Sequence, residues 1–347
     1  METVLGTLAL SYYPMDSMKA GSSLCYLTLV ALAFVVRPTA AIPWVPLLLR
    51  HFWKEPRKQH LLRRCLLIGV LVLGGSSLID RVFYGKWTVV QLNFVKFNVL
   101  QNVATFYGSH PWHWYWTQGW PVVLGPHLPF FIHGSFQIPK RHRIFLAVIL
   151  WTVAAYSVLS HKEFRFIYPV LPLCMVVCGH SLSRLKRWRP AAVSFLLASN
   201  AALALYTGLV HQRGALDVMG HLRGLCHTPK ASALMLMPCH STPYYSHIHC
   251  RLQLRFLQCP PDLTGETEYQ DEAERFYAGP LRWLAEEFPN ATALPSHLVF
   301  FSVLEQDLLS FLLSKGYERA ATFFHTHFSE GRIGSHIYVY RRTQART

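Results

Sequence analysis

Ser160–Leu173 reads SHKEFRFIYPVLPL and places His161, Lys162, Glu163 and Arg165 between two strongly apolar runs. Charged side chains are costly inside a bilayer, so a cluster of this kind marks the membrane surface where two spans meet. The stretch therefore predicts a polytopic helical membrane protein.

The composition of the whole chain agrees with this prediction. Its 347 residues are 52% hydrophobic and 15% charged, whereas soluble domains carry about 25% charged residues. The formal net charge of +15 raises the question of nucleic-acid binding, but the basic residues occupy short loops between apolar runs. These loops are Arg50–Arg64, Pro139–Arg143 and Arg184–Arg189. That pattern marks cytosolic loops and predicts no nucleic-acid partner.

The apolar runs predict a transmembrane region over residues 1–210 with about six spans. They are Leu24–Leu49, Leu66–Ile79, Pro121–Phe136, Ile144–Ser160, Phe166–Ser181 and Ala191–Val210. Arg37-Pro38 breaks the first run. The aromatic segment 80–120 is too polar to span, and we expect interfacial helices and loops there, because Trp and Tyr favour the membrane–water interface. Counting from the basic loops puts this segment, the charged cluster and the tail after about His211 on the side opposite the cytosol.

Residues 211–347 have a different character and predict a small α/β domain. Helix-like and strand-like stretches alternate along them. The helix-like stretches are Asp271–Phe288 and Leu304–Leu313, and the strand-like ones are Ala233–Met237, Leu298–Ser302 and Ile337–Tyr340. Asn290-Ala291-Thr292 is an N-glycosylation sequon on the same predicted side, so Asn290 is a candidate glycosylation site.

Four cysteines lie in this tail: Cys226, Cys239, Cys250 and Cys259. They can pair in three ways. The segment 239–250 also contains His240, His247 and His249 at spacings that suit zinc. An oxidising compartment favours disulfides over zinc, so no metal is expected. His325 and His327 are expected at the surface.

The charged cluster suits an anionic ligand at the membrane surface. Lys162 and Arg165 are expected to face phosphate oxygens, and Glu163 to orient a hydroxyl group or Arg165. The alternative is a solvated cluster that only ends two helices and sets the topology. Arg37 either contacts lipid phosphate or caps the broken helix. Interface anchoring is favoured over sugar stacking for three tryptophans, Trp112, Trp114 and Trp116.

HKEFRF followed by Tyr168-Pro169-Val170-Leu171-Pro172 resembles the signature of the dolichol-phosphate-mannose-dependent mannosyltransferases of the endoplasmic reticulum. These are polytopic GT-C glycosyltransferases of family 22. The second Glu of their HKEERF motif is Phe164 here. Further matching blocks are Arg37–Ala40, Asp80–Trp87, Asn93–Asn98 and Phe106–Tyr115. The tail segments PCHSTPYYSHIHC and FFHTHFSEGRIGSHIYVY resemble members that add the third mannose of the glycosylphosphatidylinositol (GPI) core in α-1,2 linkage.

The resemblance implies inverting transfer from dolichyl phosphate mannose to a mannosylated GPI precursor, without a cofactor. It also implies a multi-pass protein of the endoplasmic reticulum membrane with a lumenal C-terminal domain. The implied substrate-binding residues are His161, Lys162, Glu163, Arg165, Arg81, His110, His113 and Arg37.

Inversion requires a general base. The acidic pair that the family carries in its first lumenal loop has no match here, so the catalytic residue is not assigned; Asp80 and Glu163 are the candidates. The chain thus resembles an N-terminally truncated form, and we expect little or no activity from it alone. One alternative is an inactive form that only binds lipid or partners. A transporter is disfavoured, because no inverted repeat is visible and the charges gather on one face.

Overall fold

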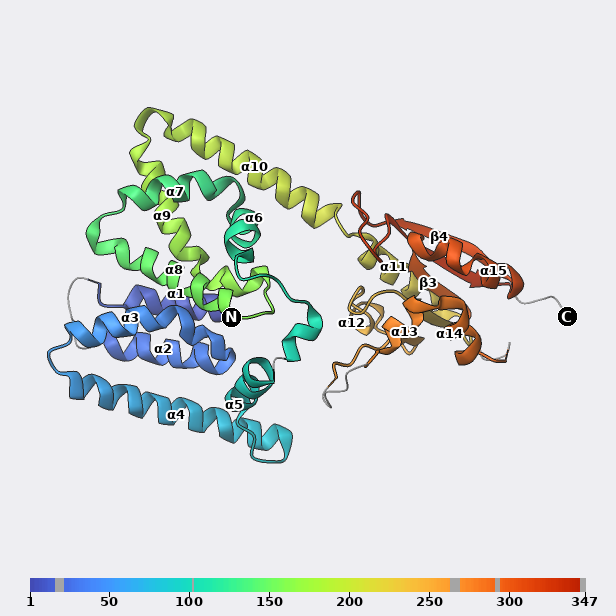
Figure 1. Cartoon of the computed structure of the whole chain (residues 1–347), viewed down its shortest axis with the longest axis horizontal. Helices are drawn as coiled ribbons and strands as arrows, with labels where there is room; N and C mark the ends of the chain where they lie inside the picture. The colour runs from blue at the N-terminus through green and yellow to red at the C-terminus, as the bar shows by residue number, and fades with distance from the viewer. Residues whose placement is uncertain (16–21, 102, 263–268, 291–293, 344–347) are drawn as a thin grey trace. The chain divides into compact units, whose positions relative to one another are not determined.

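The computed structural model describes residues 1–15, 22–101, 103–262, 269–290 and 294–343. The chain forms two units, Met1–Ser199 and Asn200–Thr347, both drawn in Figure 1. The first is helical and the second carries the sheet. The expected mainly α fold with a small α/β domain is therefore confirmed. The units divide within a helix, ten residues or so before the expected boundary at 210.

Ten α-helices start in the described part of the first unit. They are α1 (Glu2–Tyr12), α2 (Ser22–Val36), α3 (Ala41–Lys54), α4 (Lys58–Tyr84), α5 (Val90–Val95), α6 (Trp120–Leu124), α7 (Leu128–Gln137), α8 (Arg143–Val158), α9 (Leu171–Arg184) and α10 (Arg189–Leu209). Among them α1 packs on α2, α2 on α4, α3 on α8 and α7 on α9. Their shared core contains large buried side chains such as Tyr26, Tyr115 and Tyr156.

Three helical segments of the described chain are long and apolar enough to cross a membrane: Lys58–Tyr84, Phe164–Arg184 and Lys186–His227. They contain three of the six expected spans. The helix Ser23–Val36 is apolar but shorter, and α8 has 16 residues. The expected span Pro121–Phe136 is wrong as one continuous helix, because α6 and α7 are separated by a 3₁₀ turn at Gly125–His127. Gly125 has a left-handed backbone there, with φ of 47°, and Pro126 lacks a backbone donor.

The predicted break at Arg37-Pro38 is confirmed. The first apolar run divides into α2 and α3 around the 3₁₀ turn η1 (Pro38–Ala40). Arg37 is extended, with φ of −153° and ψ of 115°, as expected for a residue before proline. After the end of α4 at Tyr84, the described part of the aromatic segment 80–120 holds only short helical pieces. Besides α5 they are η2 (Lys96–Leu100), η3 (Val103–Tyr107) and η4 (Tyr115–Gly119).

A glycine brings α7 and α9 into close contact. A Cβ atom on Gly134 of α7 would collide with the carbonyl oxygen of Val177 on α9. Small residues at such crossings let two membrane helices approach at the backbone. The backbones of α7 and α9 therefore meet without an intervening side chain at this point.

The second unit is a three-layer α/β domain with a five-stranded sheet in the order β2-β1-β3-β5-β4. The strands are β1 (Ser232–Leu236), β2 (Gln253–Phe256), β3 (His297–Phe301), β4 (Tyr317–Phe324) and β5 (His336–Arg342). β1 pairs in parallel with β2 and β3, whereas β5 pairs antiparallel with β3 and β4. The expected strands at 233–237, 298–302 and 337–340 are thus confirmed as β1, β3 and β5.

Helices cover both faces of this sheet. They are α11 (Gly214–Arg223), α12 (Tyr245–Ile248), α13 (Glu272–Ala278), α14 (Pro280–Glu287) and α15 (Glu305–Ser314). The core on one face includes Phe276, Trp283 and Phe300, and the core on the other includes Met219, Met235 and Val339. Burying each such side chain contributes about 1.5–3 kcal/mol. The expected helix at 304–313 is confirmed as α15, but the expected helix at 271–288 is two helices, divided at Gly279 before Pro280.

Candidate functional site

The charged cluster lies between α8 and α9 of the first unit. The α8 helix ends at Val158, and Glu163 is extended, with φ of −138° and ψ of 152°. The 3₁₀ helix η7 (Phe164–Val170) then leads directly into α9. Pro169 lies within η7 and Pro172 at the start of α9, where its missing N–H costs nothing. The cluster is therefore the short connection between two apolar helices, as its sequence predicts.

The backbone of the aromatic segment 80–120 forms hydrogen bonds with this connection. His110 N–H donates to the Ser160 carbonyl at 2.9 Å. The Lys162 ammonium group donates to the His110 carbonyl at 2.9 Å and to the Leu159 carbonyl. His161 Nδ1 lies 2.8 Å from the carbonyl oxygen of Gly108, whose φ of 116° requires a glycine. Two motifs about fifty residues apart in sequence thus form one structure.

Aromatic side chains fill the space beneath these hydrogen bonds. Tyr115 is fully buried; its hydroxyl donates to the Glu163 carbonyl at 3.1 Å and accepts from Glu163 N–H at 3.2 Å. Trp114 packs on Phe164, with ring centroids 4.8 Å apart, and His110 stacks on Trp114 at 4.7 Å. Phe164, which departs from the family motif, therefore has a packing role. Trp114 is 6% exposed, so the expectation of an interface anchor is wrong for it, whereas Trp112 is 69% exposed.

Glu163 binds two basic side chains. Its carboxylate accepts from His161 Nε2 at 2.9 Å and from two nitrogens of Arg165. Desolvation raises the pKa of Glu163, but the hydrogen bonds from Arg165 and His161 outweigh it and hold the pKa below its usual value. Both ring nitrogens of His161 face oxygen atoms, Nδ1 the Gly108 carbonyl and Nε2 the Glu163 carboxylate. Glu163 orients Arg165, and an engaged carboxylate of lowered pKa is a poor general base.

Lys162 was expected to face phosphate oxygens, and the structure corrects that prediction. The side chain is buried and its ammonium group donates to two carbonyls of the protein. Burial lowers its pKa. A buried cation with these partners holds the loop together. Arg165 differs, because its side chain is 65% exposed.

Arg37 joins the cluster from the broken helix. Its guanidinium group lies 5.0 Å from the ring centroid of Phe166, and that of Arg165 lies 5.9 Å from the same ring. Arg37 also pairs with Glu2 of α1 at 3.4 Å. Sequence reasoning missed Glu2, since no local motif surrounds it. The one feature of the sequence that could have indicated Glu2 is that an acidic residue stands at the start of an apolar helix.

Three expected site residues are not brought into this cluster. Asp80 and Arg81 lie in the last turns of α4, and neither side chain forms an ion pair or hydrogen bond with the described residues. His113 is exposed and contacts Thr117 and Trp112 of its own segment. The cluster thus comprises Arg37, His110, His161, Lys162, Glu163 and Arg165. The positive charges of Arg37, Lys162 and Arg165 outnumber the two carboxylates of Glu163 and Glu2, so the cluster is cationic. Its exposed member, Arg165, is accessible to an anion.

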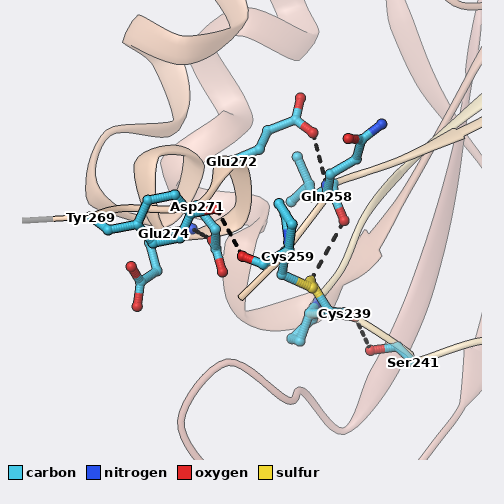
Figure 2. The surroundings of a disulfide bond; sticks show 11 residues. Cys239, Ser241, Gln258, Cys259, Tyr269, Asp271, Glu272 and Glu274 are labelled. Atoms are coloured by element: carbon cyan, nitrogen blue, oxygen red, sulfur yellow. Dashed lines mark hydrogen bonds between the residues drawn. A yellow bond between two sulfur atoms is a disulfide. The ribbon is translucent and has the colours of Figure 1, made fainter. Parts of the chain in front are cut away.

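The tail cysteines form two disulfides, Cys226–Cys250 and Cys239–Cys259. The second joins the loop after β1 to the segment that precedes α13 (Figure 2). The expected preference for disulfides over zinc is confirmed, and no metal-binding group of His, Cys, Asp and Glu is found among the described residues. His325 is 4% exposed, so its expected surface position is wrong. Asn290 is exposed, while Ala291 and Thr292 of its sequon lie outside the described residues.

A solved bacterial structure shares this architecture. ArnT from Cupriavidus metallidurans, solved in the apo state and bound to undecaprenyl phosphate, matches with a TM-score of 0.52. The match covers 98% of this chain and 73% of ArnT, at 13% sequence identity. The match shows that this chain shares the GT-C-like fold of ArnT. At this identity the comparison concerns the fold alone.

Sequence comparison defines the family. The model of the Alg9-like mannosyltransferase family matches residues 1–249, and the chain belongs to this family. It is similar to GPI alpha-1,2-mannosyltransferase 3 of Bos taurus, Mus musculus and Homo sapiens, with 62%, 63% and 61% identity over 99% of this chain. The chain spans 64% of the length of the bovine and murine relatives and 63% of the human one.

Proposed function

We propose that the protein transfers a mannose residue from dolichyl phosphate mannose to a mannosylated GPI precursor. The mannose is the third of the core, the linkage is α-1,2, and the reaction inverts the anomeric configuration. The observation that carries the proposal is the identity of 61–63% to mammalian GPI alpha-1,2-mannosyltransferase 3 over 99% of this chain.

The geometry of the cluster supports a polyprenyl phosphate donor. Arg165 is the accessible cation, and Glu163 holds its guanidinium group in a fixed orientation. A guanidinium group offers a planar set of donors that matches phosphate. ArnT is bound to a polyprenyl phosphate, undecaprenyl phosphate, in one of its structures. We assign Arg165 to the leaving phosphate, where a preorganised cation stabilises the charge that develops. Lys162 and Tyr115 position the loop that carries it.

The proposed location is the endoplasmic reticulum membrane, with the tail in the lumen. The two disulfides of the tail support an oxidising compartment. The basic loops at 50–64, 139–143 and 184–189 support a cytosolic position for the opposite ends of the spans.

The function is tested in cells that lack GPI alpha-1,2-mannosyltransferase 3. The chain is expressed alone and, in parallel, in place of the matching region of the human relative. We expect the chimera to restore GPI-anchored proteins at the cell surface and to remove the accumulated lipid with two core mannoses. A chimera that inserts normally while this lipid persists would overturn the proposal. The chain expressed alone shows whether this part of the protein is sufficient for transfer.

A further inference from the structure

The tail domain contains a pocket that the proposed reaction does not use. Parallel strands β2, β1 and β3 end at the same edge of the sheet. After β1 the chain continues to β2, which is the neighbour of β1 on one side of the sheet. After β3 the chain continues to β4, which lies on the opposite side of the sheet. Open α/β sheets bind ligands outside the carboxyl ends of their strands. A pocket of about 220 Å³ lies at this edge, around the ends of β1 and β2.

The walls of the pocket differ in chemistry. Its apolar base contains Met235, Met237 and Leu257, all at most 3% exposed. Tyr244 and Phe256 form an aromatic wall, edge to face with ring centroids 5.1 Å apart. Phe256 remains 46% exposed, so part of its ring is open to a ligand.

Polar groups line the rest. His240, Ser241 and Thr242 follow one another along the loop after β1. The Ser241 hydroxyl donates to the Pro238 carbonyl. Within the described part of the chain, neither the His240 ring nor the Thr242 hydroxyl has a hydrogen-bond partner. These two groups are available to a ligand.

The loop that carries these groups is held in place. The Cys239–Cys259 disulfide ties it to the end of the segment after β2, and Figure 2 shows Ser241 beside this bond. His240 and Tyr244 have left-handed backbones, with φ of 64° and 58°. Such conformations persist where the surrounding structure enforces them, and they gather at ligand sites.

We propose that this pocket binds one neutral sugar ring, a hexopyranoside. Its volume is below the roughly 300–1,000 Å³ of pockets for drug-sized ligands, so it suits a single ring. Among the described residues that line it there is no Lys, Arg, Asp or Glu, which disfavours a phosphate or another charged ligand. An aromatic wall matches the C–H face of a sugar, and His240 and Thr242 match its hydroxyl groups. The tail would then hold the acceptor glycan; that last link rests on the proposed function, while the binding itself does not.

The test measures binding without turnover. The full chain is reconstituted in nanodiscs from a detergent that contains no sugar, and methyl α-mannopyranoside is titrated in saturation-transfer NMR. We expect saturable binding, with a Kd on the order of 1 mM. Thr242→Val and His240→Asn each remove one ligand contact and are expected to weaken binding about three- to tenfold. Asn is chosen for position 240 because it tolerates a left-handed backbone.

His249→Asn is the matched control. His249 is also exposed and left-handed, with φ of 57°, but it does not line the pocket. Non-reducing peptide maps and unfolding temperatures establish that each variant is folded. The proposal fails if the wild-type chain gives no saturable signal, or if binding survives both pocket variants or is lost equally in the control. Because no donor is present, these outcomes are independent of the mannose-transfer test.

Discussion

The Tyr115 hydroxyl forms two hydrogen bonds with the backbone of Glu163, one as donor and one as acceptor. The Tyr115 hydroxyl donates to the Glu163 carbonyl at 3.1 Å and accepts from the Glu163 N–H at 3.2 Å. One buried phenol thus satisfies both backbone groups of the residue that orients Arg165. The position of the exposed cation therefore depends on a side chain 48 residues earlier in the chain.

Tyr115→Phe is expected to loosen the charged loop. The substitution leaves the Glu163 N–H without its partner, which costs about 1–3 kcal/mol, whereas the Glu163 carbonyl still accepts from Phe166 N–H at 3.2 Å. Mannose transfer by the chimera should fall while its membrane insertion remains normal. Tyr107→Phe is the control, because Tyr107 is exposed and contacts only Phe106 through its ring. Equal transfer by both variants would contradict this role.

Two cations three positions apart should respond differently to substitution. Arg165→Gln removes an exposed guanidinium group and is expected to raise the KM for the donor about tenfold with little change in the unfolding temperature. Lys162→Met removes a buried ammonium group that holds the His110 and Leu159 carbonyls. It should lower the unfolding temperature and kcat, with the KM for the donor nearly unchanged. The reverse result would mean that Lys162 contacts the phosphate.

The two disulfides should be found by non-reducing peptide mapping as Cys226–Cys250 and Cys239–Cys259. Cys226→Ser combined with Cys250→Ser is expected to cost about 2–5 kcal/mol of tail stability. Substituting Cys25, which is a free exposed cysteine in the first unit, is the control. Pulse proteolysis of the tail in urea measures both. Crossed pairings in the map would contradict the described tail structure.

Acidification should destabilise the tail domain. Burial lowers the pKa of His325, with His211 adding to the effect, and burial and His221 lower the pKa of His297. Below the unfolded-state value of about 6.5, the unfolded chain binds protons that the folded chain does not. Stability is therefore full above that pH and is lost as the pH falls toward the folded-state values. Pulse proteolysis at pH 7 and pH 5 should show the loss.

His325→Leu should reduce this pH dependence. His227→Leu is the control, because His227 is exposed. An unchanged pH dependence in His325→Leu would show that His325 is not a buried neutral histidine.

A lumenal tail should carry a glycan at Asn290, which is exposed. Expression in cells should give a band that glycosidase treatment shifts, and Asn290→Gln should remove the shift. Asn200→Gln is the control, since Asn200 is not followed by the sequon pattern. A tail that is unglycosylated and accessible to cytosolic protease would contradict the proposed orientation.

Hydrophobic runs and helix breakers explain which elements were predictable. β1 and β3 are buried apolar runs and were recognised as strands. β2 and β4 were missed, because the outer strands QLRF and YERAATFF carry charged residues, of which Arg255 is half-buried and Glu318 and Arg319 are exposed. The divided helix at Gly279-Pro280 and the break at Gly125-Pro126 had a local signal, since proline removes a helix hydrogen bond.

The candidate site was predictable in its residue types and not in its contacts. Sequence identified the His161–Arg165 cluster and Arg37, which do converge. It did not reveal that Lys162 is buried against carbonyls, because one of them belongs to His110, 52 residues away. Nor did it reveal that Asp80 stays outside the cluster and has no ion pair with the described residues, since this also depends on tertiary packing. The local sequence pattern identifies which charged side chains a site contains. Whether each of them is buried or exposed is decided by neighbours that are remote in sequence.

The contact between Gly134 and the backbone of Val177 has a consequence for interpreting inherited variation. Any side chain at position 134 must push α7 away from α9. The α9 helix begins at Leu171, directly after the segment that carries Arg165 and Phe166. A change from glycine to alanine at position 134 alters no polar group and lies outside the His161–Arg165 cluster, yet we expect it to displace α9 and so to impair the function of that cluster.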